Sequence, residues 1–150
     1  MRRTLFTLLF LGITCLWISC DNSDDTTTQD SPVVGNWRIT AVQVSQQELT
    51  QFSPADEVIN IELLPAGTFS GATSANQFSG RYELNGTTLT MLEFTTTEAA
   101  DTPFAGAFYE AIIEAQIPME TFAQFSFSFE NQDLILVFGN SGQMTLEALE

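Results

Sequence analysis

The stretch of sequence that most constrains the fold is residues 66–86, which read A-G-T-F-S-G-A-T-S-A-N-Q-F-S-G-R-Y-E-L-N-G. It ends in Asn85-Gly86, a dipeptide that favours a two-residue hairpin turn because both turn positions adopt positive φ. The predicted strand partners are Leu84 with Thr87, Tyr82 with Leu89 and Gly80 with Met91. This register places the large apolar residues on one face, so the turn chemistry and the hydrophobic pattern agree.

The loop before this hairpin, residues 72–77, carries small polar residues at its tip. We expect four of them to face outward, where they are available to a partner: Thr73, Ser74, Asn76 and Gln77. Asn76 can equally well brace the loop through the backbone, as Asn side chains often do in turns.

Outward from this stretch, alternating apolar residues predict further strands, and one segment has the period of a helix. Strands are expected over residues 33–44, 57–64, 68–71, 78–84, 121–130, 134–138 and 143–149. A helix is expected over about 103–116, because Thr102 can cap it, Pro103 suits its first turn and Pro118 follows its end. The expected fold class is α+β: a mainly antiparallel β meander, forming a partly open barrel-like sheet with one packed helix.

Two sets of residues allow a functional and a structural interpretation. The alternating Phe125, Phe127 and Phe129 predict either the core under the helix or the lining of a ligand pocket. Glu110 and Glu114, one helical turn apart, predict either a solvated helix face or a pair for acid/base chemistry. We favour the structural interpretation of both.

The first 19 residues have a charged start, Arg2-Arg3, and an apolar run typical of a secretory signal. The run Trp17-Ile18-Ser19-Cys20 resembles a bacterial lipobox, in which the Cys is acylated and becomes the first residue. The alternatives are cleavage before Cys15, a Cys15–Cys20 disulfide, or a secreted protein cut elsewhere. The expected organisation is a lipoprotein signal peptide (1–19), a disordered acidic tether (20–32) and one folded domain (33–150).

Composition limits the function classes. Beyond Cys20 the chain carries two Arg against 19 acids, a net charge of −17, and it has no Lys or His. Phosphate contacts need cations, so nucleic acid is an unsuitable partner. The lack of His and Lys removes common general bases, and no Cys/His zinc set exists. The Asp-rich run 21–30 lacks the spacing of a calcium loop. We therefore expect no enzyme activity, no metal and no cofactor.

Several motifs occur together in an order typical of one family. They are Gly35 and Trp37, the G-T-F-S-G run from Gly67, the N-x-F-x-G-x-Y motif of Asn76, Phe78, Gly80 and Tyr82, the Thr95-Thr96-Thr97 run, and the closing L-I-L-V-F. Over residues 34–149 the chain resembles the META domain of HslJ-type heat-shock lipoproteins. Many members have Cys where this chain has Ala75 and Ala100, and Ala105 stands where the family has Glu.

The resemblance implies a cell-envelope location, links to heat and antibiotic stress, and no established catalytic residues. The residues after Cys20 also resemble the acidic export signal of Bacteroidetes lipoproteins, which implies an outer-membrane lipoprotein displayed at the surface. We therefore expect a non-enzymatic module, held in the membrane by acyl chains on Cys20, that binds an envelope protein or supports stress tolerance. The alternatives are a lipocalin-like binder of a small apolar ligand and, less favoured, a carboxylate-dependent hydrolase. A closed apolar cavity would favour the ligand binder, and a filled core the interaction module. The oligomeric state is left open.

Overall fold

The computed structural model describes residues 31–45, 47 and 49–149. It contains nine strands and one helix: β1 (Gly35–Gln43), β2 (Gln51–Phe52), β3 (Ile59–Leu63), β4 (Thr68–Ala72), β5 (Gln77–Asn85), β6 (Thr88–Thr96), α1 (Pro103–Glu114), β7 (Ala123–Glu130), β8 (Asp133–Phe138) and β9 (Gly142–Ala148). The predicted strands and helix are all present. The two-residue β2 was not predicted, because its polar surroundings show no alternation.

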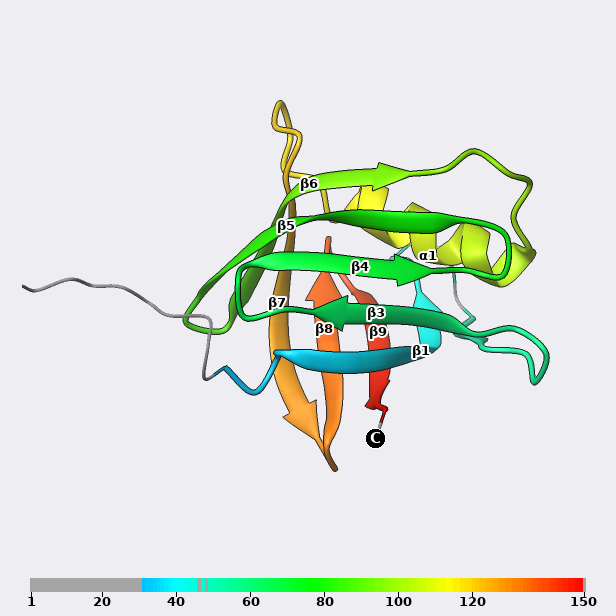
Figure 1. Ribbon diagram of the computed structural model, residues 1–150, viewed down its shortest axis with the longest axis horizontal. Coiled ribbons are helices and arrows are strands. Elements are labelled where there is room, and N and C mark those ends of the chain that lie inside the picture. Colours follow the sequence, from blue (N-terminus) through cyan, green and yellow to red (C-terminus); the bar gives the residue numbers. More distant parts are fainter. Residues whose placement is uncertain (1–30, 46, 48, 150) are drawn as a thin grey trace, which may run out of the picture.

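The strands form a closed antiparallel barrel of eight strands. Each strand from β3 to β9 pairs with the next, and β1 closes the ring by pairing with both β3 and β9. β2 is an additional edge strand on β1. Figure 1 shows β3–β6 crossing in front of β7–β9, with α1 behind β5 and β6. The barrel-like antiparallel sheet with one packed helix is confirmed, and the ring is complete rather than partly open.

The helix forms where the sequence predicts it. The hydroxyl of Thr102 accepts a hydrogen bond from the Ala105 N–H, and Pro103 occupies the first turn. The same hydroxyl donates to the buried carboxylate of Glu57, which reaches the helix N-terminus from the loop before β3. That contact places a negative charge where the helix dipole favours one. α1 therefore begins at a position fixed by two separate segments.

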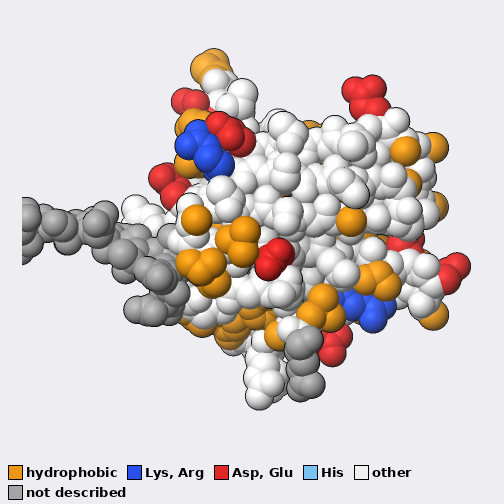
Figure 2. Space-filling view, viewed as in Figure 1, with side chains coloured by type: hydrophobic (Ala, Val, Ile, Leu, Met, Phe, Trp, Pro, Cys, Tyr) orange, Lys and Arg blue, Asp and Glu red, His pale blue; other side chains and the backbone are white. Residues whose placement is uncertain are grey.

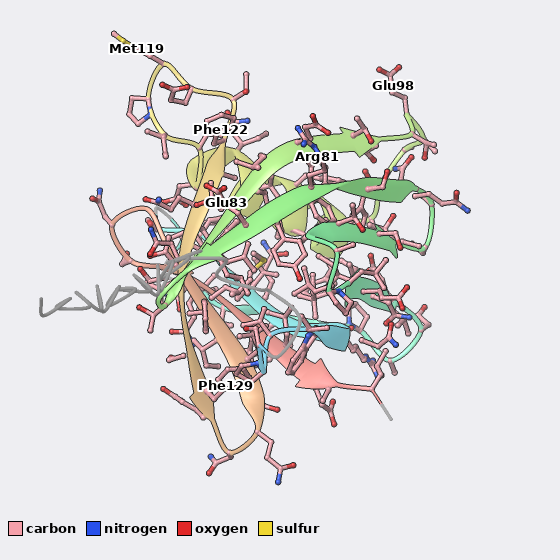
Figure 3. The ribbon with its side chains drawn as sticks, turned by 60° about the vertical axis from the view of Figure 1, so that its left-hand side comes forward. Arg81, Glu83, Glu98, Met119, Phe122 and Phe129 are labelled. Atoms are coloured by element: carbon pink, nitrogen blue, oxygen red, sulfur yellow. The ribbon has the colours of Figure 1, made fainter. Side chains whose placement is uncertain are left out.

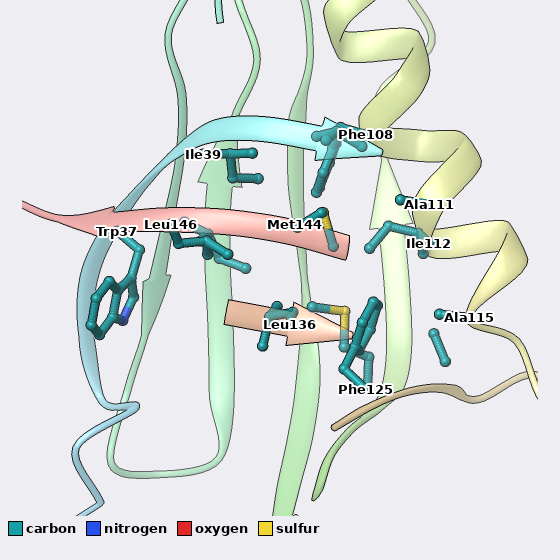
Figure 4. Close-up of a cluster of buried hydrophobic side chains, with 14 of the residues drawn as sticks. Trp37, Ile39, Phe108, Ala111, Ile112, Ala115, Phe125, Leu136, Met144 and Leu146 are labelled. Atoms are coloured by element: carbon teal, nitrogen blue, oxygen red, sulfur yellow. The ribbon is translucent and has the colours of Figure 1, made fainter. Parts of the chain in front are cut away.

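One face of α1 packs into the barrel. Phe108, Ala111 and Ile112 are buried against the strands, and Figure 4 shows their side chains directed toward β1 and β9. Inside the barrel, aromatic and aliphatic side chains fill the space, among them the fully buried Phe69 and Phe125. The barrel interior is thus a packed core, the outcome that favours an interaction module over an enclosed carrier.

The predicted hairpin register is wrong by two residues at Leu84 and Tyr82, and by three at Gly80, which pairs with Phe94 beyond a bulge between Arg81 and Tyr82. Leu84 pairs with Leu89 and Asn85 with Thr88, so the turn consists of Gly86 and Thr87. Only Gly86 has positive φ there, at 58°. A turn with Gly at its first central position needs one positive φ rather than two, which allows the shift. Between the turn and Tyr82 the shift of two residues preserves the face of each side chain, so Tyr82 and Leu89 are buried as expected.

The aromatic row of β7 divides along its length. Phe125 is fully buried and meets Phe138 edge-on, with ring centroids 5.7 Å apart. Phe127 is half-buried, and Phe129 is exposed on the β7–β8 hairpin, where it lies 6.1 Å from the ring of Trp37. The expectation of one continuous core row is therefore correct only for Phe125. The hairpin extends past the barrel core (Figure 3), so the later rings have less to pack against.

Candidate functional site: a groove between β6 and α1

Asn76, one of the predicted site residues, is buried rather than exposed. Its amide nitrogen donates to the Ala99 carbonyl (3.0 Å) and to Asp101 Oδ1 (2.9 Å). Its amide oxygen accepts from the Ala99 N–H and the Thr97 hydroxyl. Asn76 therefore fixes the segment between β6 and α1 to the β4–β5 loop.

The expectation that all four loop-tip residues face outward is wrong for two of them. Thr73 is buried, and its hydroxyl accepts from the Asn76 N–H and donates to Asp101 Oδ1. Ser74 and Gln77 are exposed as expected. The loop folds back on itself because the Thr73 hydroxyl satisfies backbone donors within it. This loop is thus a brace for the neighbouring segment.

The other motif residues of β5 shape the barrel wall. Phe78 is buried and stacks on Phe94, with ring centroids 5.5 Å apart. A Cβ atom at Gly80 would lie 1.8 Å from the Glu93 carbonyl oxygen, so only Gly fits against β6 there. Tyr82 donates its hydroxyl to the Leu64 carbonyl (2.8 Å), and burial raises the pKa of its phenol. Phe78 and Gly80 therefore position β6 against β5, whereas Tyr82 fixes the turn between β3 and β4.

Gly35 and Trp37 lie at the start of β1, which β3, β4 and β5 separate from β6. The indole N–H of Trp37 donates to the Val33 carbonyl at 2.8 Å, and the ring is buried. This contact anchors the chain as it enters the domain. The predicted lipid-attachment residue, Cys20, lies outside the described residues.

An apolar hollow on the described surface is an open groove of about 950 Å³ between β6 and α1, which we call the β6–α1 groove. One wall is formed by residues 92–99 with Asp101, and the other by α1 with Thr121. Its apolar side chains are Leu92, Phe94, Tyr109, Ile112 and Ile113. Ile113 is 64% exposed, although it is a large aliphatic residue in a helix.

The groove exists because β6 is longer than its pairing with β7. β7 pairs with β6 only from Thr88 to Met91. β7 begins at Ala123, the partner of Met91, and the segment after α1 borders the other edge of β7, where the Gln124 N–H donates to the Ala115 carbonyl at 2.8 Å. The second half of β6 therefore has β5 on one side and the groove on the other.

The charge of the groove is negative. Glu93, Glu98 and Asp101 line it, and none of its described lining residues is Lys or Arg. Glu93 accepts a hydrogen bond from Arg81 at 2.7 Å, which lowers the pKa of Glu93, and both side chains are more than half exposed. Glu98 points away from the barrel on the segment after β6 (Figure 3). Figure 2 shows acidic side chains spread over the face in view, with arginine only in isolated spots.

Sequence reasoning did not find this groove. In the sequence, the Thr95-Thr96-Thr97 run is part of a family motif, and Ile113 belongs to no motif. Alternation cannot reveal where a strand loses its neighbour, because that depends on the pairing of β7, far along the chain. The available signal was Ile113, an aliphatic residue off the buried face of a well-defined helix.

The remaining features of the described surface are less suited to a site. A second hollow, of about 630 Å³, lies over the outer side of β3–β6 and is lined mostly by small uncharged polar side chains such as Ser70 and Ser79. Glu110 is exposed and accepts from Gln47, and Glu114 accepts from the Ser45 N–H, so each carboxylate contacts a loop rather than the other. The described part of the chain shows no group of three or more metal-ligating side chains and no helix long and apolar enough to cross a membrane.

Fold and surface together define a small closed antiparallel barrel with a filled core, one packed helix and an open groove beside that helix. The META domain family model matches residues 31–149. The chain belongs to the META domain family.

Two solved structures match this chain in a structural comparison. A protein from Burkholderia xenovorans, solved by NMR, is 18% identical, with a TM-score of 0.58 over 77% of this chain and 81% of its own. An uncharacterised protein from Bacteroides eggerthii is 14% identical, with a TM-score of 0.46 over 77% of this chain and 98% of its own. A search of curated proteins found no match. At these identities the first likeness concerns the fold alone.

Proposed function

We propose that this chain is a lipid-anchored, non-catalytic module of the cell envelope that binds another protein through the β6–α1 groove. The observation that carries the proposal is the groove itself, an apolar surface beside a strand that lacks a neighbour. Exposed apolar surface of this kind is typical of protein interaction sites. The filled barrel supports the same function, since binding must then use the outer surface.

The buried polar groups favour binding over catalysis. Glu57 is the one buried carboxylate among the described residues, and it is engaged by the hydroxyl of Thr102. A hydrolase that uses two carboxylates needs both in one cleft, across the scissile bond. Asp101 belongs to a hydrogen-bond network in which it accepts from the side chains of Asn76 and Thr73, and it thereby holds the β4–β5 loop.

The anchor is proposed to be a triacylated Cys20, and the location is the outer membrane, at its surface. The support is the charged and apolar leader, the lipobox-like run and the acidic residues that follow. Two or more acyl chains hold a protein stably on a membrane. We expect Cys20→Ala to abolish labelling with radioactive palmitate, whereas Cys15→Ala should leave it unchanged. Undiminished labelling of Cys20→Ala would disprove the anchor.

Binding through the groove can be tested in intact cells with the anchor in place. A photo-crosslinking amino acid at Ile113 should give a discrete product with an envelope protein upon irradiation. The same amino acid at Val137, which is 42% exposed on β8, serves as the control and should not give it. A product of equal yield from both positions, or none from Ile113, would contradict the proposed function.

A small apolar ligand is the second candidate, because the volume of the groove lies in the range of small-molecule sites. Its site would be the β6–α1 groove rather than the Phe125 face, which is buried in the core. Mass spectrometry of protein released from its anchor and kept free of detergent would detect such a ligand. Ile113→Asp should release the ligand if it occupies the groove.

A further inference from the structure

We propose that the partner contributes an extended, Lys- or Arg-rich segment that adds to the free edge of β6 as a further strand. This inference rests on the proposed function and specifies how the β6–α1 groove binds.

The first support is the unpaired backbone of β6. β6 runs from Thr88 to Thr96, but its pairing with β7 ends at Met91. β7 itself begins at Ala123, the partner of Met91, so its pairing with β6 extends no further. From Leu92 onward β6 therefore pairs with β5 alone. A strand edge of this kind is a template for an additional strand.

The second support is the direction of the backbone groups. Thr97 donates its N–H to the Gln77 carbonyl at 3.0 Å, toward β5. Backbone groups alternate in direction along a strand, so those of Thr95 and Glu93 also point toward β5. The N–H and C=O groups of Phe94 and Thr96 then point toward the groove. They offer an incoming strand two donors and two acceptors.

The third support is the chemistry on the two faces of that edge. On the inner side lie Tyr109, whose hydroxyl is 3.0 Å from that of Thr96, and the exposed Ile113. On the outer side lies Glu93, 55% exposed. Successive side chains of a strand point to opposite faces. A segment that alternates apolar and cationic residues would thus place apolar side chains on α1 and cations beside Glu93.

Charge also distinguishes this occupant from the nearest alternatives. The chain's own residues 21–30 carry four Asp and no cation, so Glu93, Glu98 and Asp101 would repel them. A second copy of the chain, with the same excess of acids, would be repelled for the same reason. A cationic partner is attracted by the whole surface and by the groove in particular.

The test uses the full-length chain in a zwitterionic detergent, at about 150 mM salt, with two synthetic peptides. The probe is Lys-Val-Lys-Val-Lys-Val-Lys with blocked ends, and the control replaces every Lys by Glu. We expect the Lys peptide to bind at least tenfold more tightly than the Glu peptide. On binding, the amide hydrogen exchange of Phe94 and Thr96 should slow at least tenfold, while that of exposed Asn85 should not change.

A matched pair of variants tests the backbone contribution. Thr96→Pro removes an edge N–H, which an edge strand tolerates, and should weaken binding of the Lys peptide at least tenfold. Thr96→Val removes the hydroxyl but keeps the N–H, and should bind like the wild type. If Thr96→Pro does not fold, protection of the Phe94 amide in the wild type decides the question alone.

The outcomes separate this inference from the proposed function. If the Lys peptide binds without protecting Phe94 and Thr96, or binds no better than the Glu peptide, strand addition by a cationic segment is wrong. If Ile113 still crosslinks an envelope protein in that case, the proposed function stands without it. If the edge amides are protected but Ile113 crosslinks nothing, the edge binds peptides and the proposed function fails.

Discussion

Two parts of the barrel wall contrast with each other. Where β8, β9 and β1 meet, every strand has two neighbours, and large side chains such as Ile39 and Leu146 fill the interior. Where β6 leaves β7, a helix covers the interior instead of a strand, and a half-buried Phe94 takes the place of a fully buried residue. The helix seals the core but leaves backbone hydrogen-bonding groups of β6 without a strand partner. The difference shows how a closed barrel can keep one free edge.

The largest predicted effect on stability comes from replacing a phenylalanine in each of these two parts of the barrel wall. Phe125→Ala, where β6 and β7 are paired, should lower the free energy of unfolding by about 3–5 kcal/mol, because it leaves a cavity in a packed core. Phe94→Ala should cost less, since its ring is only partly buried. Urea unfolding monitored by circular dichroism measures both. Equal losses would show that the free edge is as tightly packed as the paired wall.

The second prediction tests what holds the free edge in place. Asn76→Ala leaves the Ala99 N–H and carbonyl without their partner and should cost about 1–3 kcal/mol. Hydrogen exchange should increase at residues 97–102 more than in β1 or β9. Ser74→Ala, an exposed residue of the same loop, is the control and should change neither. Uniform loss of protection across the barrel would mean that Asn76 serves the whole fold rather than this segment.

The paired wall was largely predictable from the sequence, and the free edge was not. Alternation in residues 134–138 and 143–149 and the capping signals at Thr102 and Pro103 specify elements locally, so strands and helix were expected at the correct places. The exact register at Gly86 was not, because two turn types satisfy the same hydrophobic pattern. Ring closure and the groove depend on pairing between distant segments, such as β1 with β9 and β6 with β7. Buried Asn76 was ambiguous for the same reason: its partners lie more than twenty positions away.

A third prediction concerns pH and the paired side of β5. Burial raises the pKa of Tyr82, so the unfolded chain loses this proton first as pH rises. Stability from the neutral phenol is therefore complete below pH 10 and declines as pH rises through the higher native pKa. Tyr82→Phe should lower the free energy of unfolding by about 1 kcal/mol at neutral pH, because the hydrogen bond to Leu64 is lost. Above pH 10 the stability of this variant should fall less steeply with pH than that of the wild type. Thermal melts at a series of pH values provide the measurement, and identical alkaline slopes would contradict it.

The smallest effect on stability is expected from substitution of Arg81. The same substitution distinguishes best between the paired wall of the barrel and the free edge of β6. The Arg81–Glu93 pair is exposed to solvent, and such pairs add little to stability, so Arg81→Gln should leave the melting temperature unchanged. Without the guanidinium, the pKa of Glu93 should rise toward its ordinary value. That value lies well below neutral pH, so the carboxylate remains charged. It then becomes available to a cation at the free edge. The Lys-Val peptide should then bind a few-fold more tightly.

The control is Asn85→Asp, which makes the same change in net charge about 13 Å away along β5. This distance is beyond the screening length at 150 mM salt, so the control should have a smaller effect. Isothermal titration of both variants measures the difference. Equal tightening would assign the attraction to the net charge of the whole surface, and only a larger effect at Arg81 would locate it at the free edge of β6.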